Sequence, residues 1–104
     1  MLSPNSPNRL MGIFPAELRL VRQAKSGNVY GFVELYDLYV EQDHRYVNLL
    51  VPNNRVAEGL TFQVFFKAWE QLDRYRSLGE SFVSWLYSIA QKQVDVYRRT
   101  HEQG

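Results

Sequence analysis

Positively charged side chains gather in the last third of the sequence, where they could bind phosphate. Between residues 74 and 100, five basic residues stand against two acidic ones, whereas the formal net charge of the chain is only +1 at pH 7. The basic residues are Arg74, Arg76, Lys92, Arg98 and Arg99. Cations grouped in this way neutralise nucleic-acid phosphates. They equally suit a solvated helix end, where they complement the helix dipole. Charge alone leaves both interpretations open.

The sequence contains no residue set that predicts catalysis or metal binding. It has no cysteine, and its two histidines, His44 and His101, lack the spacing of a zinc or catalytic pair, so each is expected at the surface. A glycine-rich phosphate loop and a nucleophile elbow are both missing from the sequence. Acids such as Glu34 and Asp37, or Glu41 and Asp43, lie beside bases, as on salt-bridged helix surfaces. We therefore expect a non-enzymatic protein with no catalytic residue, metal or cofactor.

The composition indicates one ordinary globular domain. The chain has 104 residues, of which 45% are hydrophobic and 22% charged. No apolar run approaches the roughly 18 residues that a membrane span requires. The N-terminus has no signal-peptide pattern, and the lack of cysteine fits a reducing compartment. We expect a cytoplasmic protein without a membrane span.

Helix start and stop signals divide the chain into four predicted helices. Pro15 suits a first helical position, Gly27 a helix end, Asn53 or Asn54 an N-cap, and Ser81 another N-cap. Strand signals are poor. The predicted helices span residues 15–26, 29–50, 55–72 and 82–99, with a loop before the last one.

Apolar residues recur at three- and four-residue steps in each predicted helix, which favours a compact all-α bundle of about four helices. Residues 1–14 are expected to be a flexible tail, 15–100 the folded domain and 101–104 a second tail. The expected core-facing positions are Leu18, Leu20, Val21, Phe32, Leu35, Tyr36, Tyr39, Tyr46, Leu49, Leu50, Leu60, Val64, Phe65, Ala68, Trp69, Leu72, Phe82, Leu86, Ile89, Val96 and Tyr97.

The order and spacing of these motifs resemble region 2 of the bacterial RNA polymerase sigma factors, especially the extracytoplasmic-function class. That family shows A-x-x-G-[DN], A-F-x-x-L-Y, A-E-D-L-x-Q-E-x-F-x-x-A-W, F-R-x-W-L-x-x-I-A-R-N and D-x-x-R-R in this order. The resemblance covers residues 16–99, and it implies a sigma region 2-like fold. The matching residues are Ala24, Gly27, Asn28, Phe32, Leu35, Tyr36, Ala57, Glu58, Leu60, Val64, Phe65, Ala68, Trp69, Phe82, Trp85, Leu86, Ile89, Ala90, Asp95, Arg98 and Arg99.

The resemblance implies that the third helix binds a coiled coil of the polymerase β′ subunit. The positions carried over to this role are Glu58, Gly59, Phe62, Gln63 and Phe66. The family has acids and a Gln-Glu pair here, whereas this chain keeps one acid and has glycine, phenylalanine and glutamine at the others. The two phenylalanines are expected to form a small exposed aromatic patch.

The resemblance also implies that the loop and the fourth helix bind the non-template single strand of the promoter −10 element. The positions carried over are Arg74, Arg76, Ser81, Trp85, Ser88, Lys92, Arg98 and Arg99. Because this chain has fewer cations at these positions than the family pattern has, we expect its DNA binding to be weaker and less dependent on salt. Trp85 suits base stacking, but a core anchor is the favoured interpretation, and Tyr75 is likewise expected to pack.

Two functional hypotheses remain open at this stage. The first is a sigma-type domain that binds core polymerase and promoter DNA in the nucleoid, with an anti-sigma factor as a further partner. The alternative is a diverged sigma-like domain without promoter activity, which uses Phe62 and Phe66 to bind another protein or a second copy of itself. An unrelated helical bundle is improbable because the ordered match is long.

Overall fold

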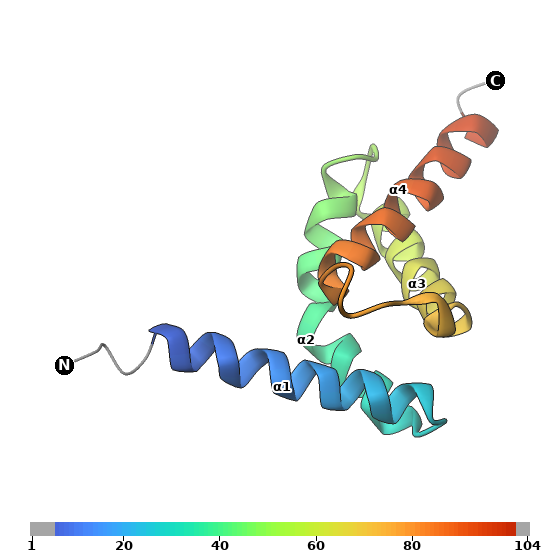
Figure 1. Ribbon diagram of the computed structural model, residues 1–104. Coiled ribbons are helices and arrows are strands. Elements are labelled where there is room, and N and C mark those ends of the chain that lie inside the picture. The colour runs from blue at the N-terminus through green and yellow to red at the C-terminus, as the bar shows by residue number, and fades with distance from the viewer. Residues whose placement is uncertain (1–5, 102–104) are drawn as a thin grey trace. The chain divides into compact units, whose positions relative to one another are not determined.

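The computed structural model describes residues 6–101, with side chains from residue 16 onward, and this part of the chain is helical without any strand. Its elements are α1 (Ser6–Lys25), α2 (Val29–Asn48), α3 (Asn54–Glu70), the 3-10 helix η1 (Leu72–Arg74) and α4 (Phe82–His101) (Figure 1). The prediction of an all-α fold of about four helices is confirmed. The chain forms two units, one ending at Leu35 and the other beginning at Tyr36, so α2 contributes to both.

Helix α1 begins at Ser6 and not at Pro15, where the sequence predicted its start. Pro7 lies in the first turn, where a missing backbone N–H has no helical partner to lose. Pro15 lies inside the helix, where one backbone hydrogen bond cannot form. Residues 1–5 of the predicted tail, and 102–104 of the second tail, lie outside the described residues.

The turn between α1 and α2 depends on two glycines. Gly27 has a φ of +97°, and its amide donates to the carbonyl of Ala24 over 3.0 Å, which ends α1 as predicted. Gly31 lies where α2 begins, and a Cβ atom there would be 2.7 Å from the carbonyl oxygen of Leu20. The close approach of the two helices therefore requires glycine at position 31.

In the second unit, aromatic rings join α2 to α3 and to α4. Tyr36 meets Phe65 of α3 edge-on, with ring centroids 4.9 Å apart. Tyr39 contacts Phe82 at the start of α4 at 5.9 Å. Further along, Tyr46 stacks on Tyr87 of α4 at 4.3 Å. These contacts hold the last four turns of α2 against both later helices.

Most of the residues predicted to face the core are buried. Some of the wrongly predicted positions lie on the opposite side of their helix from a buried apolar residue. Val94 is buried while Val96, two residues later and on the opposite side of α4, is exposed, because two residues turn a helix by about 200°. On α2, Val47 is buried, whereas Leu49 lies beyond the helix end and is exposed. Exposure contradicts the core prediction at Leu18, Tyr36, Leu49, Trp69 and Val96. Burial was not predicted at Glu17, Ala24, Asp43, Val47, Ala57, Thr61, Ala90 and Val94.

Candidate functional site

The five residues predicted to contact polymerase lie together on the exposed face of α3. Asn53 caps the helix by accepting a hydrogen bond from the amide of Val56 over 2.9 Å, as the sequence predicted for Asn53 or Asn54. Phe62 is 72% exposed and Phe66 is 55% exposed, so the predicted aromatic patch is confirmed as a structural feature. Glu58, Gly59 and Gln63 are also exposed.

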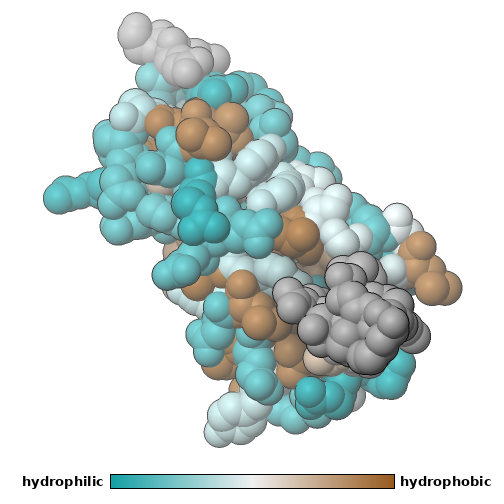
Figure 2. Space-filling model, turned by 90° about the vertical axis from the view of Figure 1, so that its left-hand side faces the viewer, coloured by the Kyte–Doolittle hydropathy of each residue, from teal (hydrophilic) through white to brown (hydrophobic). Residues whose placement is uncertain are grey.

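Other large apolar side chains also reach the surface, so exposure alone does not set α3 apart. Leu38 and Leu78 are both exposed, and the face drawn in Figure 2 shows several separate apolar patches within a mainly hydrophilic surface. On α3 the exposed apolar residues Phe62 and Phe66 are both aromatic and lie one helical turn apart. Trp69 lies one further turn along and is 37% exposed.

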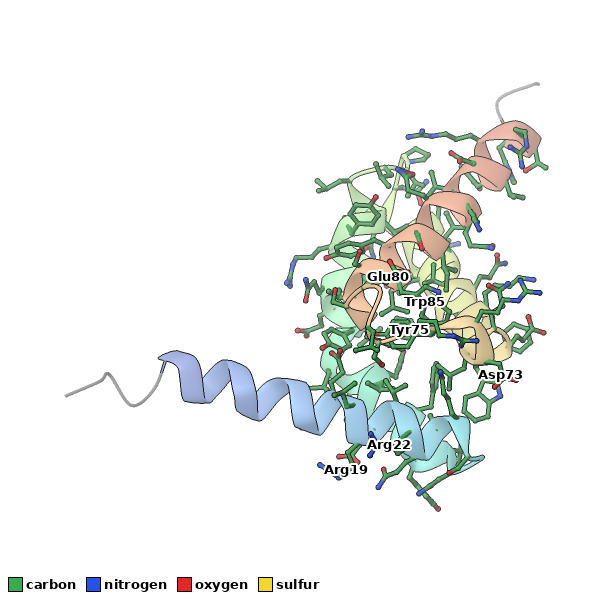
Figure 3. The ribbon with its side chains drawn as sticks, viewed as in Figure 1. Arg19, Arg22, Asp73, Tyr75, Glu80 and Trp85 are labelled. Atoms are coloured by element: carbon green, nitrogen blue, oxygen red, sulfur yellow. The ribbon has the colours of Figure 1, made fainter. Side chains whose placement is uncertain are left out.

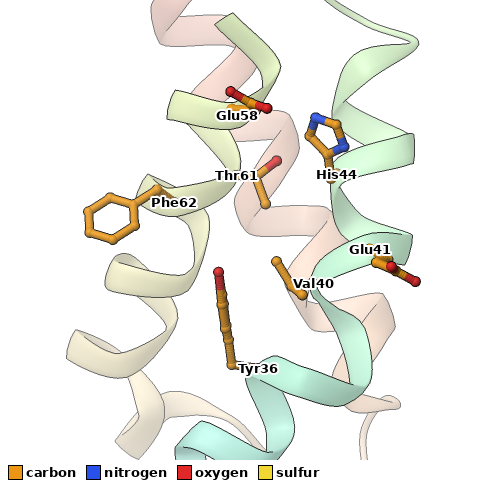
Figure 4. Close-up of a pocket in the computed structure, with 7 residues that line it drawn as sticks. All are labelled: Tyr36, Val40, Glu41, His44, Glu58, Thr61 and Phe62. Atoms are coloured by element: carbon orange, nitrogen blue, oxygen red, sulfur yellow. The ribbon is translucent and has the colours of Figure 1, made fainter. Parts of the chain in front are cut away.

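A groove lies beside this face, between α2 and α3, with a volume of about 360 Å³. It is lined by Tyr36, Val40, Glu41, His44, Glu58, Thr61 and Phe62 (Figure 4). Thr61 is only 4% exposed, and its Oγ1 atom has no hydrogen-bond partner among the described residues. The Nε2 atom of His44 is likewise buried and unpartnered there, so His44 is not the plain surface residue that the sequence predicted.

The loop before α4 is closed by a tyrosine. The hydroxyl group of Tyr75 donates to the backbone carbonyl of Glu80 over 2.8 Å (Figure 3). The Tyr75 ring is buried, with its centroid 5.4 Å from that of Phe82 and 5.1 Å from that of Trp85. Trp85 is 8% exposed, which supports its interpretation as a core anchor. A base could stack on Trp85 only if this packing opened, and its role in DNA binding stays a prediction.

The two serines predicted to contact DNA, Ser81 and Ser88, each form a hydrogen bond within or at the start of α4. Ser81 caps α4, because its Oγ accepts a hydrogen bond from the amide of Ser84 over 3.2 Å. Ser88 donates to the carbonyl of Trp85 over 2.7 Å. Both hydroxyl groups therefore already contribute to the first turns of the helix.

The predicted DNA-binding cations do not all lie on one surface. Arg98 donates from Nη2 to the carbonyl oxygen of Leu50 over 2.8 Å, so it faces the C-terminal end of α2. Lys92 and Arg99 are exposed and lie on the same side of α4 as Ser88, at helical spacing. Arg76 of the loop donates to the backbone carbonyls of Asp73 and Tyr75, while Arg74 is exposed. Lys92 and Arg99 thus share one side of α4, two turns apart with Asp95 between them, while Arg98 is directed toward Leu50.

The prediction that Asp43 is a salt-bridged surface acid is wrong. Asp43 of α2 is wholly buried, and neither of its carboxyl oxygens has a hydrogen-bond partner among the described residues. Burial raises its pKa from 3.8 to about 7, because the charged form loses its hydration. Its position, one turn from Tyr39 and one from Val47, could have indicated this, since both are apolar.

Comparison with known families defines the class of domain to which this arrangement belongs. The sigma-70 region 2 family matches residues 35–102, and the chain therefore belongs to that family. Over 77 residues it is 32% identical to the ECF RNA polymerase sigma factor BldN of Streptomyces coelicolor, covering 74% of this chain and 29% of that protein. It is 26% identical over 70 residues to the ECF RNA polymerase sigma factor SigW of Bacillus subtilis, covering 67% of this chain and 37% of that protein. The resemblance to the extracytoplasmic-function class is confirmed.

The matched segment is a small part of each relative, since the chain spans about a third of the length of these two proteins. No solved structure gives a significant match. Within residues 6–101, no helix combines the length and apolar content needed to cross a bilayer. In the same part of the chain, no group of three histidine or acidic side chains could hold a metal ion.

Proposed function

We propose that this domain acts in transcription initiation, binding core RNA polymerase through α3 and the promoter −10 element through the loop and α4. Membership of the sigma-70 region 2 family supports this proposal. The observation that carries it is the exposed face of α3, where all five positions inferred for polymerase contact point away from the core. The proposal places the protein in the cytoplasm, at the nucleoid.

Binding to core RNA polymerase distinguishes this proposal from a sigma-like domain without promoter activity. The full chain should co-purify with core polymerase, and Gln63→Lys or Phe66→Lys should weaken that binding because each places a cation on the contact face. Glu58→Lys should do the same. Glu70→Gln, an exposed substitution on the same helix, is the matched control. The proposal is wrong if the wild-type chain does not bind, or if the three substitutions leave binding unchanged.

A second candidate function is self-association or binding to another protein, without promoter activity. The 72% exposure of Phe62 favours it, because a large exposed apolar side chain gains most from being covered by a partner. Sedimentation over a range of concentrations should then show a dimer that Phe62→Gln abolishes. A monomer at all concentrations would contradict self-association.

A further inference from the structure

A second pocket lies between the C-terminal half of α2 and helix α4. Its volume is about 440 Å³, which is within the range of small-molecule sites. Its described lining residues are Gln42, Arg45, Tyr46, Asn48, Leu49 and Tyr87. They include one cation and no carboxylate, so the pocket favours a ligand that carries negative charge.

Two stacked tyrosines form a fixed wall of this pocket. The rings of Tyr46 and Tyr87 have centroids 4.3 Å apart and planes inclined by 25°. Gln42 donates a hydrogen bond from Nε2 to the hydroxyl group of Tyr87 over 3.0 Å, which holds the second ring in place. Both rings are only half-buried. A further planar ring can therefore extend the stack, as nucleobases do on aromatic side chains.

The polar side chains beside the tyrosines suit the edge of a base. Asn48 is exposed, and its amide group offers both a donor and an acceptor. The amide of Gln42 keeps its carbonyl oxygen and a second N–H beyond the bond to Tyr87. Side-chain amides of this kind pair with the N6 donor and the N7 acceptor of adenine. Leu49 at the pocket is 85% exposed and gains from being covered by a flat ring.

Arg45 supplies the single positive charge of the pocket. It is exposed, precedes Tyr46 on α2 and has no ion-pair partner among the described residues. One guanidinium group matches one phosphate group, whereas a nucleic-acid strand is held by a row of cations. Tyr87 also lies about 100° around α4 from Ser88, on whose side Lys92 and Arg99 lie. The pocket therefore does not share the side of α4 that carries those two cations.

We infer that this pocket binds a free adenine nucleotide with one phosphate group. The base stacks on the Tyr46–Tyr87 pair, the amides of Gln42 and Asn48 bond to its edge, and Arg45 binds the phosphate. This site is independent of the proposed function, whose partners are both macromolecules, and it gives the domain a small-molecule ligand.

Isothermal titration calorimetry of the full chain with AMP, adenosine and ribose 5-phosphate tests the site. AMP should bind, and adenosine and ribose 5-phosphate should each bind at least about tenfold more weakly, because each lacks one half of the ligand. Arg45→Gln should weaken AMP binding by about tenfold and leave adenosine binding unchanged, because only the phosphate contact is lost.

The tyrosine pair has its own variants. Tyr46→Leu should weaken the binding of AMP and of adenosine alike, by about tenfold, because the stacking surface is removed. Tyr46→Phe keeps the ring and should bind both as the wild type does. Arg22→Gln, at an exposed arginine of α1 outside the pocket, is the matched control and should not change AMP affinity.

The inference is overturned if AMP does not bind, or if Arg45→Gln weakens AMP and adenosine equally. Because Arg45 is exposed, its variant is expected to fold, and it decides the question even if Tyr46→Leu unfolds the protein. A single-stranded −10-like oligonucleotide should bind Arg45→Gln and wild type with equal affinity. If it loses as much affinity as AMP does, the pocket holds a nucleotide of a strand, and the assignment to a free nucleotide is wrong.

Discussion

The hydroxyl group of Tyr75 donates a hydrogen bond to the backbone carbonyl of Glu80, five residues later, across 2.8 Å. This bond spans the loop that joins η1 to α4, while the ring of Tyr75 is buried against Phe82 and Trp85. One side chain thus fixes both the path of the loop and its attachment to the core.

Tyr75→Phe should keep the packing and remove only this hydrogen bond. We expect the free energy of unfolding to fall by about 1 kcal/mol, the usual net value of such a bond. We also expect faster amide exchange in the loop, measured by hydrogen–deuterium exchange. Tyr30→Phe, at an exposed tyrosine, should change neither quantity. Unaltered loop exchange in Tyr75→Phe would show that the bond does not hold the loop.

Because the pKa of Asp43 is raised in the folded protein, we expect the free energy of unfolding to fall as the pH rises. Its pKa is about 7 in the folded protein and 3.8 in its ordinary state, so above pH 3.8 the unfolded chain releases a proton that the folded chain keeps. The loss of stability grows from about pH 4 and is complete just above pH 7, where the folded carboxyl group also ionises. Between pH 5 and pH 8 this loss should be roughly 3 kcal/mol.

Urea unfolding of wild type and of Asp43→Asn at these two pH values measures this effect, because asparagine does not titrate. The stability advantage of Asp43→Asn over wild type should increase from pH 5 to pH 8. Asp37→Asn, at an exposed acid of the same helix, is the control variant. A pH-independent difference between wild type and Asp43→Asn would mean that Asp43 does not carry the raised pKa.

Gly31 and Gly59, which both lie in helices, should respond oppositely to substitution by alanine. A Cβ atom at Gly59 would meet nothing within 4 Å, so Gly59→Ala should raise stability by about 1 kcal/mol through helix propensity. At Gly31, the same atom would lie 2.7 Å from the carbonyl oxygen of Leu20, so the two helices would have to move apart. Thermal unfolding of the two variants should therefore give shifts of opposite sign, and shifts of the same sign would refute this account.

Arg98 and Arg99 should differ in DNA binding although they are neighbours. Arg98 is bonded to the carbonyl oxygen of Leu50, whereas Arg99 is exposed on the side of Lys92. On the proposed function, Arg99→Ala should weaken binding to a single-stranded −10-like oligonucleotide and lower the salt slope by about 0.7, as for one lost phosphate contact. Arg98→Ala should lower the melting temperature of the protein, because it removes the hydrogen bond to Leu50. It should lower DNA affinity less than Arg99→Ala does.

Fluorescence anisotropy titrations at several salt concentrations, together with thermal unfolding, measure both effects. The same oligonucleotide in duplex form should bind the wild-type chain more weakly than the single strand, because the bases are then unavailable for stacking. Equal effects of the two arginine substitutions on DNA affinity would contradict the separation of their roles.

Local signals in the sequence were sufficient for most of the fold. Gly27 and Asn53 ended and capped their helices as predicted, because each acts through its own backbone or its nearest neighbours. The predicted helix start at Pro15 was wrong. Proline suits the first turn of a helix, but in α1 that place is taken by Pro7, and Pro15 lies inside the helix. Val94 and Val96 were exchanged in the predicted core, since both are apolar and only the packing of α4 decides which one is buried.

Less of the candidate site than of the fold could be predicted from the sequence. The outward direction of Phe62 and Phe66 follows from helical spacing and was predicted. The unpartnered hydroxyl of Thr61 and the imidazole of His44 were not, because neither residue type indicates burial and their convergence depends on how α2 packs against α3. Arg98 was likewise grouped with Arg99 by charge, and only its bond to Leu50 separates them.

The two tryptophans of the chain occupy contrasting environments, and this gives the protein two intrinsic optical reporters. Trp85 is enclosed by Tyr75 and Phe82, so its emission should shift to longer wavelength when the core unfolds. Trp69 is partly exposed on α3, one turn beyond Phe66, so quenching by iodide should reach it first. With Trp85→Phe, the remaining signal would report directly when a partner covers α3, without any attached dye.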